Sequence, residues 1–240
     1  MLLKNEDRQM QKLNEIRPVY WARGYNLSVP LAQIMSYVYE CLQILRPGSW
    51  VLDLGGGEGR FLKSAPPDRP YLVYAVEVIA AAFKKYAALM KRQGRGDVAV
   101  QGDVTDPKVY RVGVAAAIMW RVLHALPPEL HRKVCELVFN SLLPGGSFFI
   151  AVLSEEDWEC KALPEYQRGV MHDLALVRGL KEPFPAFFFW EEYFLELLKN
   201  AGFEIVKIQA FMEGTGFLKN KQEGKPPHSF FFAHVRKPAQ

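Results

Sequence analysis

The fold of this chain is decided by the stretch VLDLGGGEGR at residues 51–60. Together with Trp50, its first residues form a short apolar run that ends in glycines, as a buried strand of a parallel sheet does. The glycines let the backbone turn sharply and approach a ligand closely, because they carry no Cβ. A short helix expected at 60–64 would place its N-terminus, which favours negative groups, behind that turn. The stretch therefore predicts a strand, a ligand-binding glycine loop and a helix at the carboxyl edge of a sheet.

Strands and helices alternate on the C-terminal side of this stretch. Apolar runs predict further strands at 71–78, 98–101, 112–120 and 147–153. Apolar residues at helical spacing predict helices at 79–92 and 127–142. This alternation is typical of an α/β fold with a doubly wound, mostly parallel, Rossmann-like sheet and helices on both of its faces.

The flanking segments complete a single domain. An apolar stripe predicts a helix from Ser28 to Leu45, and a helix at 190–200 precedes strands at 203–211 and 229–236. No helix is expected between these last two strands, which indicates an antiparallel pair at the sheet edge and a total of seven strands. We interpret residues 1–240 as one domain whose parts are an N-terminal helical cap (1–49), a ligand-binding core (50–153), a lid segment (154–190) and a C-terminal helix with edge strands (191–240).

The spacing of the glycines discriminates between nucleotide ligands. A dinucleotide fingerprint, G-x-G-x-x-G, fails because its third glycine position falls on Arg60 when counted from Gly55. This disfavours an NAD-dependent oxidoreductase, and the phosphate-binding pattern G-x-x-x-x-G-K-[ST] is absent too. The pattern that remains, D-x-G-x-G-x-G, is filled by Asp53, Gly55, Gly57 and Gly59. In this motif the chain resembles the class I S-adenosylmethionine (SAM)-dependent methyltransferases.

Two carboxylates at later strand ends extend the resemblance. Glu77 ends the second strand, where an acidic side chain can accept both hydroxyls of a ribose. The resemblance implies that Asp103, at the end of the third strand, accepts from the adenine amino group and that the N–H of Val104 reaches the ring. It also implies that the cofactor, SAM, is contacted by the following residues: Gly56, Val78 and Trp120. The close resemblance covers about residues 50–153, but the fourth strand opens at 111–115 without the acidic residue that the family often carries there.

Histidines are the candidate catalytic residues. His124 follows the fourth strand, near the expected position of the transferred methyl group, and a histidine can act as a general base near neutral pH. The chain resembles small-molecule O-methyltransferases here, but it has His124-Ala125-Leu126 in place of their His-Asp-Trp, so a packing role for His124 stays open. His172 is a second candidate, with a polar lid position as its alternative. The remaining histidines are interpreted as structural: His131, His228 and His234.

The lid segment and the N-terminal aromatic residues are expected to enclose the ligands. The lid segment is long, irregular and rich in aromatic residues, which suits an apolar or aromatic small-molecule acceptor. Part of this aromatic set, the run 187–190, is expected to fill the core instead. From the other side, Tyr25 and Arg23 could close over SAM, with Arg23 paired to its carboxylate.

Composition narrows the function further. The formal net charge is +4 with scattered basic residues, so no clear nucleic-acid site is expected. Three cysteines without metal-ligand spacing predict reduced thiols, no metal and a cytoplasmic protein, and no apolar stretch is long enough to span a membrane. The sequence therefore predicts an enzyme that transfers a methyl group from SAM to oxygen, nitrogen or carbon of a small molecule. It leaves open an RNA or protein methyltransferase, a non-catalytic SAM-binding regulator, and a monomer or a homodimer.

Overall fold

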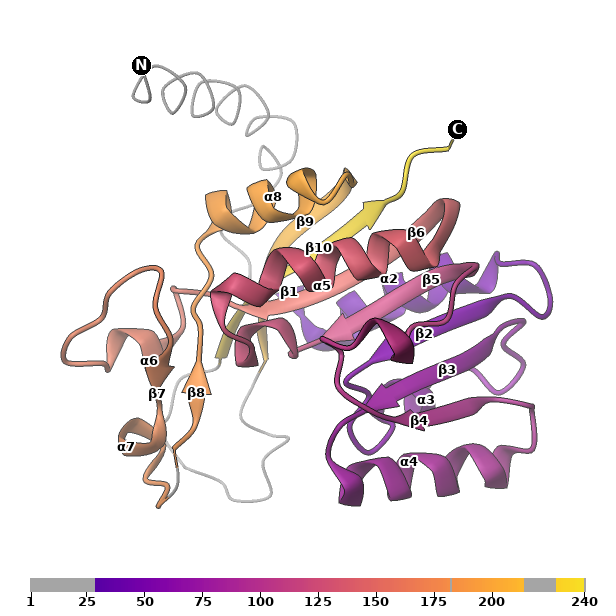
Figure 1. The fold of residues 1–240 in the computed structure, drawn as a ribbon, viewed down its shortest axis with the longest axis horizontal. Coiled ribbons are helices and arrows are strands. Elements are labelled where there is room, and N and C mark those ends of the chain that lie inside the picture. Colours follow the sequence, from indigo (N-terminus) through magenta and orange to yellow (C-terminus); the bar gives the residue numbers. More distant parts are fainter. Residues whose placement is uncertain (1–28, 182, 214–227, 240) are drawn as a thin grey trace.

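The computed structural model describes residues 29–181, 183–213 and 228–239 (Figure 1). Their main sheet has eight strands in the order β1-β9-β10-β6-β5-β2-β3-β4. The strands are β1 (Val29–Pro30), β2 (Trp50–Leu54), β3 (Leu72–Glu77), β4 (Val98–Gln101), β5 (Val114–Trp120), β6 (Leu142–Leu153), β9 (Glu204–Glu213) and β10 (His228–Arg236). The larger helices are α2 (Leu31–Gln43), α4 (Ala80–Gln93), α5 (Pro128–Ser141) and α8 (Glu191–Asn200), and the short α3 (Arg60–Ser64) follows the glycine loop.

The pairing of the strands confirms a doubly wound, mostly parallel sheet. Strand β2 pairs in parallel with β3 and β5, β3 with β4, and β5 with β6. Strand β10 is antiparallel to both β6 and β9, which confirms the antiparallel pairing predicted for the last two strands. The two-residue β1 adds an eighth strand, parallel to β9. Strand β6 begins at Leu142 rather than Ser147, since Leu142 already pairs with Val114 across an irregularity in the register.

Helices cover both faces of the sheet, so the strands are buried on both sides. Leu52 packs with α5 and α8 in one apolar cluster, and the adjacent Val51 packs with α2, α3 and α4 in the other. This alternation follows from the pleat, which points successive side chains to opposite faces. It explains why β2 is a continuous apolar run, apart from Asp53. Figure 1 shows α5 and α8 in front of the sheet and α2 behind it.

The lid segment lies beyond the ends of the parallel strands (Figure 1). It contains α6 (Trp158–Lys161), α7 (Ala175–Arg178) and a small antiparallel sheet of β7 (His172–Asp173) and β8 (Pro185–Ala186). Its end, residues 187–189, returns to the sheet, where Phe189 N–H donates to Leu153 O at 2.9 Å. Phe187 and Phe189 enter one core cluster and Phe188 enters the other. These three phenylalanines fill the core, as the sequence predicts.

Candidate functional site

The glycines of the loop at residues 55–59 have different physical roles. Gly55, Gly57 and Gly59 have φ of +67°, +56° and +82°, a region that disfavours side chains. A Cβ on Gly55 would lie 2.2 Å from Val122 Cγ2, and one on Gly56 would lie 2.3 Å from Tyr86 Cε1. A Cβ on Gly57 would meet no atom of the described residues within 4 Å. Gly55 and Gly56 therefore allow the loop to pack on the protein, whereas Gly57 presents bare backbone on an open side.

Asp53 supports the loop from inside the fold. Asp53 is 2% exposed, and its Oδ2 accepts a hydrogen bond from the Tyr86 hydroxyl at 2.6 Å. Burial raises the pKa of Asp53 to about 6, although the hydrogen bond from Tyr86 opposes the shift. A Cβ on Gly56 would also lie 2.9 Å from Asp53 Oδ2. Asp53 and Tyr86 thus form the base on which the loop rests.

Glu77 joins the end of β3 to the open side of the loop. One carboxylate oxygen, Oε2, accepts from Gly57 N–H at 2.7 Å, and Oε1 accepts from Ile79 N–H at 2.8 Å. The next two side chains are exposed apolar groups, with Val78 at 57% and Ile79 at 62% exposure. A carboxylate fixed in this way can bind hydroxyl groups, and the exposed apolar surface beside it can cover a flat ring.

Asp103 occupies the corresponding position after β4. It is exposed, and its Oδ1 accepts from Thr105 N–H at 2.8 Å, which fixes the turn. Val104 is 6% exposed, and its carbonyl accepts from the Tyr110 hydroxyl at 2.7 Å. Because β2, β3 and β4 are parallel neighbours, their ends meet at one edge of the sheet, here called the carboxyl edge. Glu77 and Asp103 therefore follow the glycine loop along that edge, in the order that the sequence predicts.

The chain turns sharply where β5 reaches the carboxyl edge. Trp120 packs its ring 5.6 Å from Phe211, and its Nε1 is buried without a hydrogen-bond partner in the described part of the chain. Arg121 follows with φ of +64°, the one non-glycine residue with a positive φ in the described ranges. A buried donor without a partner and a strained residue commonly mark a ligand site.

His124 lies just beyond this turn, in the one-turn helix η2 (Leu123–Ala125). It is 8% exposed, and among the described residues its buried Nδ1 has no hydrogen-bond partner. Burial, followed by the positive charges of Arg121 and Arg178, lowers the pKa of His124 to about 3. This burial of η2, which the sequence does not reveal, disfavours the protonated form of His124.

His172 lies in the small sheet of the lid segment. Its Nε2 is 2.8 Å from the carbonyl of Gln167, and its ring lies 5.2 Å from that of Tyr166. His172 is thus tied to the lid's own backbone. Arg23 and Tyr25, predicted to close over SAM, lie outside the described residues.

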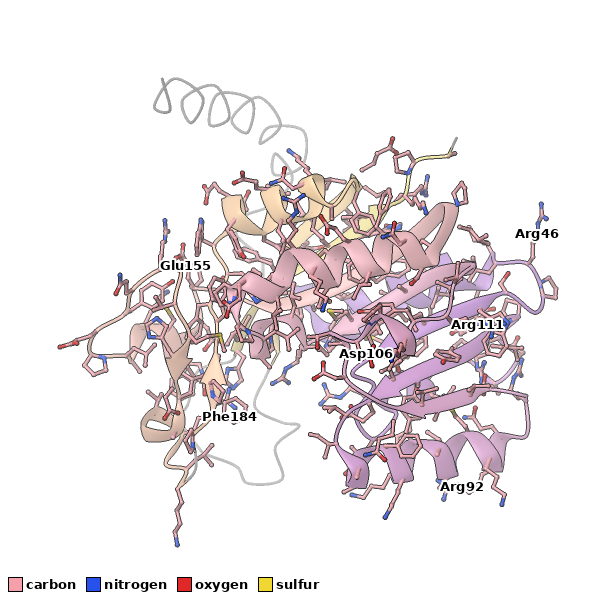
Figure 2. All side chains as sticks on the ribbon, viewed as in Figure 1. Arg46, Arg92, Asp106, Arg111, Glu155 and Phe184 are labelled. Atoms are coloured by element: carbon pink, nitrogen blue, oxygen red, sulfur yellow. The ribbon has the colours of Figure 1, made fainter. Side chains whose placement is uncertain are left out.

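The side chains labelled in Figure 2 lie toward opposite ends of the parallel strands. Asp106, after β4, lies on the side that faces the lid segment, where Glu155 and Phe184 are located. Arg46, Arg92 and Arg111 lie toward the opposite edge. The carboxyl edge and the lid segment therefore lie on the same side of the molecule.

Comparison with known proteins identifies the family. A family model described as a methyltransferase domain matches residues 26–208. This chain belongs to the methyltransferase domain family. It is a SAM-dependent methyltransferase with a class I, Rossmann-like fold, as the sequence predicts. No curated protein matches it.

Solved structures with the same fold share little sequence with this methyltransferase. A SAM-dependent methyltransferase of Methanosarcina mazei is 15% identical, with a TM-score of 0.64 over 85% of this chain and 98% of the other. The 1,6-didemethyltoxoflavin-N1-methyltransferase of Burkholderia thailandensis, solved with 1,6-didemethyltoxoflavin and S-adenosylhomocysteine, is 21% identical, with a TM-score of 0.57 over 85% and 78%. The [4+2]-cyclase SpnF is 17% identical, with a TM-score of 0.63 over 92% and 87%.

A polar cluster at the start of α6 is not indicated by the sequence. Asp157 and Glu159, at the start of α6, lie against His228 at the start of β10, and Glu159 is paired with Arg178 of α7. His228 and Asp157 are 71 positions apart in the sequence, and no motif links them. Only the antiparallel placement of β10 beside β6 brings them together.

The part of the chain that the structure describes has no helix that is both long and apolar enough to cross a membrane.

Proposed function

We propose that this methyltransferase transfers the methyl group of SAM to a small molecule that binds between the carboxyl edge and the lid segment. The observation that carries the proposal is the open backbone at Gly57, which lies beside the anchored carboxylate of Glu77 and the exposed Val78. A binding site of this kind fits an adenosine whose ribose hydroxyls bind to Glu77. The sulfonium of SAM supplies an electrophilic methyl group, and the protein positions the acceptor and excludes water.

The resemblance to the family, together with this geometry, supports the proposed cofactor contacts. Each oxygen of Glu77 has accepted one backbone N–H, so each retains a lone pair for a ribose hydroxyl. Asp103 would accept from the adenine amino group, and Val104 N–H would reach the ring. Val78 would cover one face of the adenine. Trp120 Nε1, a buried donor without a partner in the described residues, would reach the methionine part of SAM.

Several observations favour a small acceptor. The lid segment contributes its own helices and sheet at the carboxyl edge, and the structural neighbour from Burkholderia acts on a small heterocycle. The cyclase neighbour indicates that this fold also serves another reaction, so the fold alone does not define the chemistry.

Reduced, unpaired thiols at Cys41, Cys135 and Cys160 support a cytoplasmic location.

His124 and His172 are candidates for the group that accepts a proton from the acceptor. His124 has the better position, directly after β5. Its lowered pKa, however, makes protonation about 5 kcal/mol less favourable than for a solvated histidine, because each pKa unit is worth about 1.4 kcal/mol. His124 would therefore act as a neutral group that orients the acceptor, and His124→Ala should raise the KM for the acceptor more than it lowers kcat.

Calorimetry and label transfer test the proposed function. The purified protein is titrated with S-adenosylhomocysteine and, separately, with NAD; we expect heat with the first and none with the second. It is then incubated with SAM labelled in the methyl group and with three cell fractions: small molecules, RNA and protein. Label in the small-molecule fraction supports the proposal. Heat with NAD alone would contradict the cofactor site, and label confined to RNA or protein would contradict the acceptor class.

A further inference from the structure

His228 lies at the carboxyl edge of the sheet, the edge that also carries the glycine loop. It opens β10, which is antiparallel to β6, so the start of β10 lies at the carboxyl edge. Phe230 pairs with Leu153, the last residue of β6, and Ser154 N–H donates to Ser229 O at 3.0 Å. Since β5, β6 and β10 are neighbours, His228 lies two strands away from the end of β5 and on the same edge.

A buried carboxylate orients the imidazole of His228. Nδ1 lies 3.2 Å from Asp157 Oδ2 and 3.4 Å from Oδ1, and the side-chain exposure is 12% for His228 and 0% for Asp157. Asp157 is itself fixed, because it accepts backbone N–H groups from Ser229 at 2.7 Å and from Glu159 at 2.8 Å. An ionised carboxylate only accepts, so the nitrogen that faces it carries the proton. Nε2 is then the nitrogen with the free lone pair, and within the described ranges the hydrogen bonds of His228 all involve Nδ1.

The charged and titratable groups near His228 belong to α6, α7 and η2. From α6, Glu159 Oε2 lies 3.8 Å from Nδ1, and Glu159 is held by two hydrogen bonds from Arg178 of α7, at 2.8 and 2.7 Å. His124 of η2 lies close enough for the charge of His228 to act on it. Asp157 therefore remains the negative group nearest to an imidazolium, since Arg178 neutralises Glu159.

The same three ligand groups, Asp157, Glu159 and His228, lie within 4.8 Å of one another and could in principle hold a metal ion. Arg178 argues against it, because its guanidinium already satisfies both oxygens of Glu159. Backbone N–H groups occupy both oxygens of Asp157. A metal ion would have to compete with these donors and with the positive charge of Arg178, whereas an imidazole fits the cluster unchanged.

We propose that His228, oriented by Asp157, is the general base that removes the proton of a hydroxyl acceptor during methyl transfer. The inference rests on the proposed function. The acceptor oxygen forms a bond to the methyl carbon, and the carbon–sulfur bond breaks with its electron pair remaining on sulfur. The hydroxyl proton passes to Nε2 of His228, Asp157 stabilises the resulting imidazolium, and water finally takes the proton. Asp157 is a positioning residue in this scheme, in the way a third group orients the base of a catalytic triad.

The tautomer of His228 is the first test, and it does not need the acceptor. Protein labelled with ¹⁵N in its histidines is studied by NMR at neutral pH, and the signals of His228 are assigned by their loss in His228→Gln. We expect protonated Nδ1 and unprotonated Nε2 in the parent protein, and a mixture of both tautomers in Asp157→Asn. The matched control is Asp173→Asn, because Asp173 also accepts two backbone N–H groups in the lid segment, but its carboxylate has no hydrogen bond to a histidine of the described residues.

Turnover and cofactor binding complete the test. With the fraction that takes label from SAM, His228→Gln should lower kcat by about 10²–10⁴-fold with an unchanged KM for SAM. Asp157→Asn should lower kcat less and shift the pH–rate profile, and Asp173→Asn should do neither. S-adenosylhomocysteine binding is measured on every variant. Failure of the parent protein to bind it overturns the proposed function, whereas normal binding with a protonated Nε2 on His228, or with unchanged kcat in His228→Gln, overturns the role of His228 alone.

Discussion

Gly57 offers a direct test of whether the glycine loop holds a ligand. Gly57→Ala adds a methyl group that meets no atom of the described protein within 4 Å, so its effect on the fold is limited to the strain at φ of +56°. A left-handed conformation costs a non-glycine residue about 1–2 kcal/mol. If a ligand lies against this backbone, the methyl group also overpacks it, at about 1–3 kcal/mol. That energy corresponds to a loss of about five- to 150-fold in affinity.

Gly94→Ala is the matched control for that strain. Gly94 ends α4 at the opposite edge of the sheet, with φ of +63° and no atom of the described residues within 4 Å of the added Cβ. Urea unfolding should give a similar loss of stability in both variants, and calorimetry should give weaker S-adenosylhomocysteine binding in Gly57→Ala only. Equal affinities in the two variants would refute the reasoning, because the open side of the loop would then face no ligand.

Further predictions concern the carboxylates at the carboxyl edge and a buried histidine. Glu77→Ala and Asp103→Ala should each weaken S-adenosylhomocysteine binding by about 1–3 kcal/mol in calorimetry. Glu77→Ala should also destabilise the fold more than Asp103→Ala, because the buried Glu77 accepts from two backbone N–H groups and the exposed Asp103 from one. Burial lowers the pKa of His234 to about 4, so the fold favours the neutral ring. This preference adds about 3 kcal/mol to the free energy of unfolding above pH ~6.5, and it is lost as the pH falls toward ~4. Urea unfolding across this range should therefore show a weaker pH dependence for His234→Gln than for the parent protein, and equal dependence would contradict the shift.

The cofactor half of the site could be predicted from the sequence because its determinants are local. A strand, a turn that only glycines allow and a helix succeed one another within residues 50–64, and each step has its own signature in the sequence. Glu77 and Asp103 are recognisable because parallel strands end at one edge, so the position of a carboxylate in its strand fixes its place in space. The contact of Asp53 with Tyr86 is less local and was not predicted, since it depends on how α4 packs below the loop.

The acceptor half could not be predicted because it depends on tertiary contacts. The sequence places His124 after β5, but the burial that lowers its pKa comes from the packing of η2 and the return of the lid segment at Phe187, whose N–H donates to the carbonyl of His124 at 2.7 Å. The sequence predicts a structural role for His228 on an expected edge strand, but β10 lies between β9 and β6. The carboxylate partner of His228, Asp157, belongs to a segment with no strand or helix pattern strong enough to place it.

The two histidines at the carboxyl edge have environments that suit different tasks. His124 is buried, and in the described part of the chain its Nδ1 has no partner, so protonation is unfavourable and the ring is suited to accept or donate a hydrogen bond while neutral. His228 has a carboxylate against Nδ1, which both selects the tautomer and stabilises the charge that a general base acquires. The positive charge that a base acquires is therefore stabilised by Asp157 at His228, whereas burial disfavours it at His124. A general base must also lie within hydrogen-bond reach of the proton that it removes, so the role of His228 requires the acceptor hydroxyl to reach the start of β10.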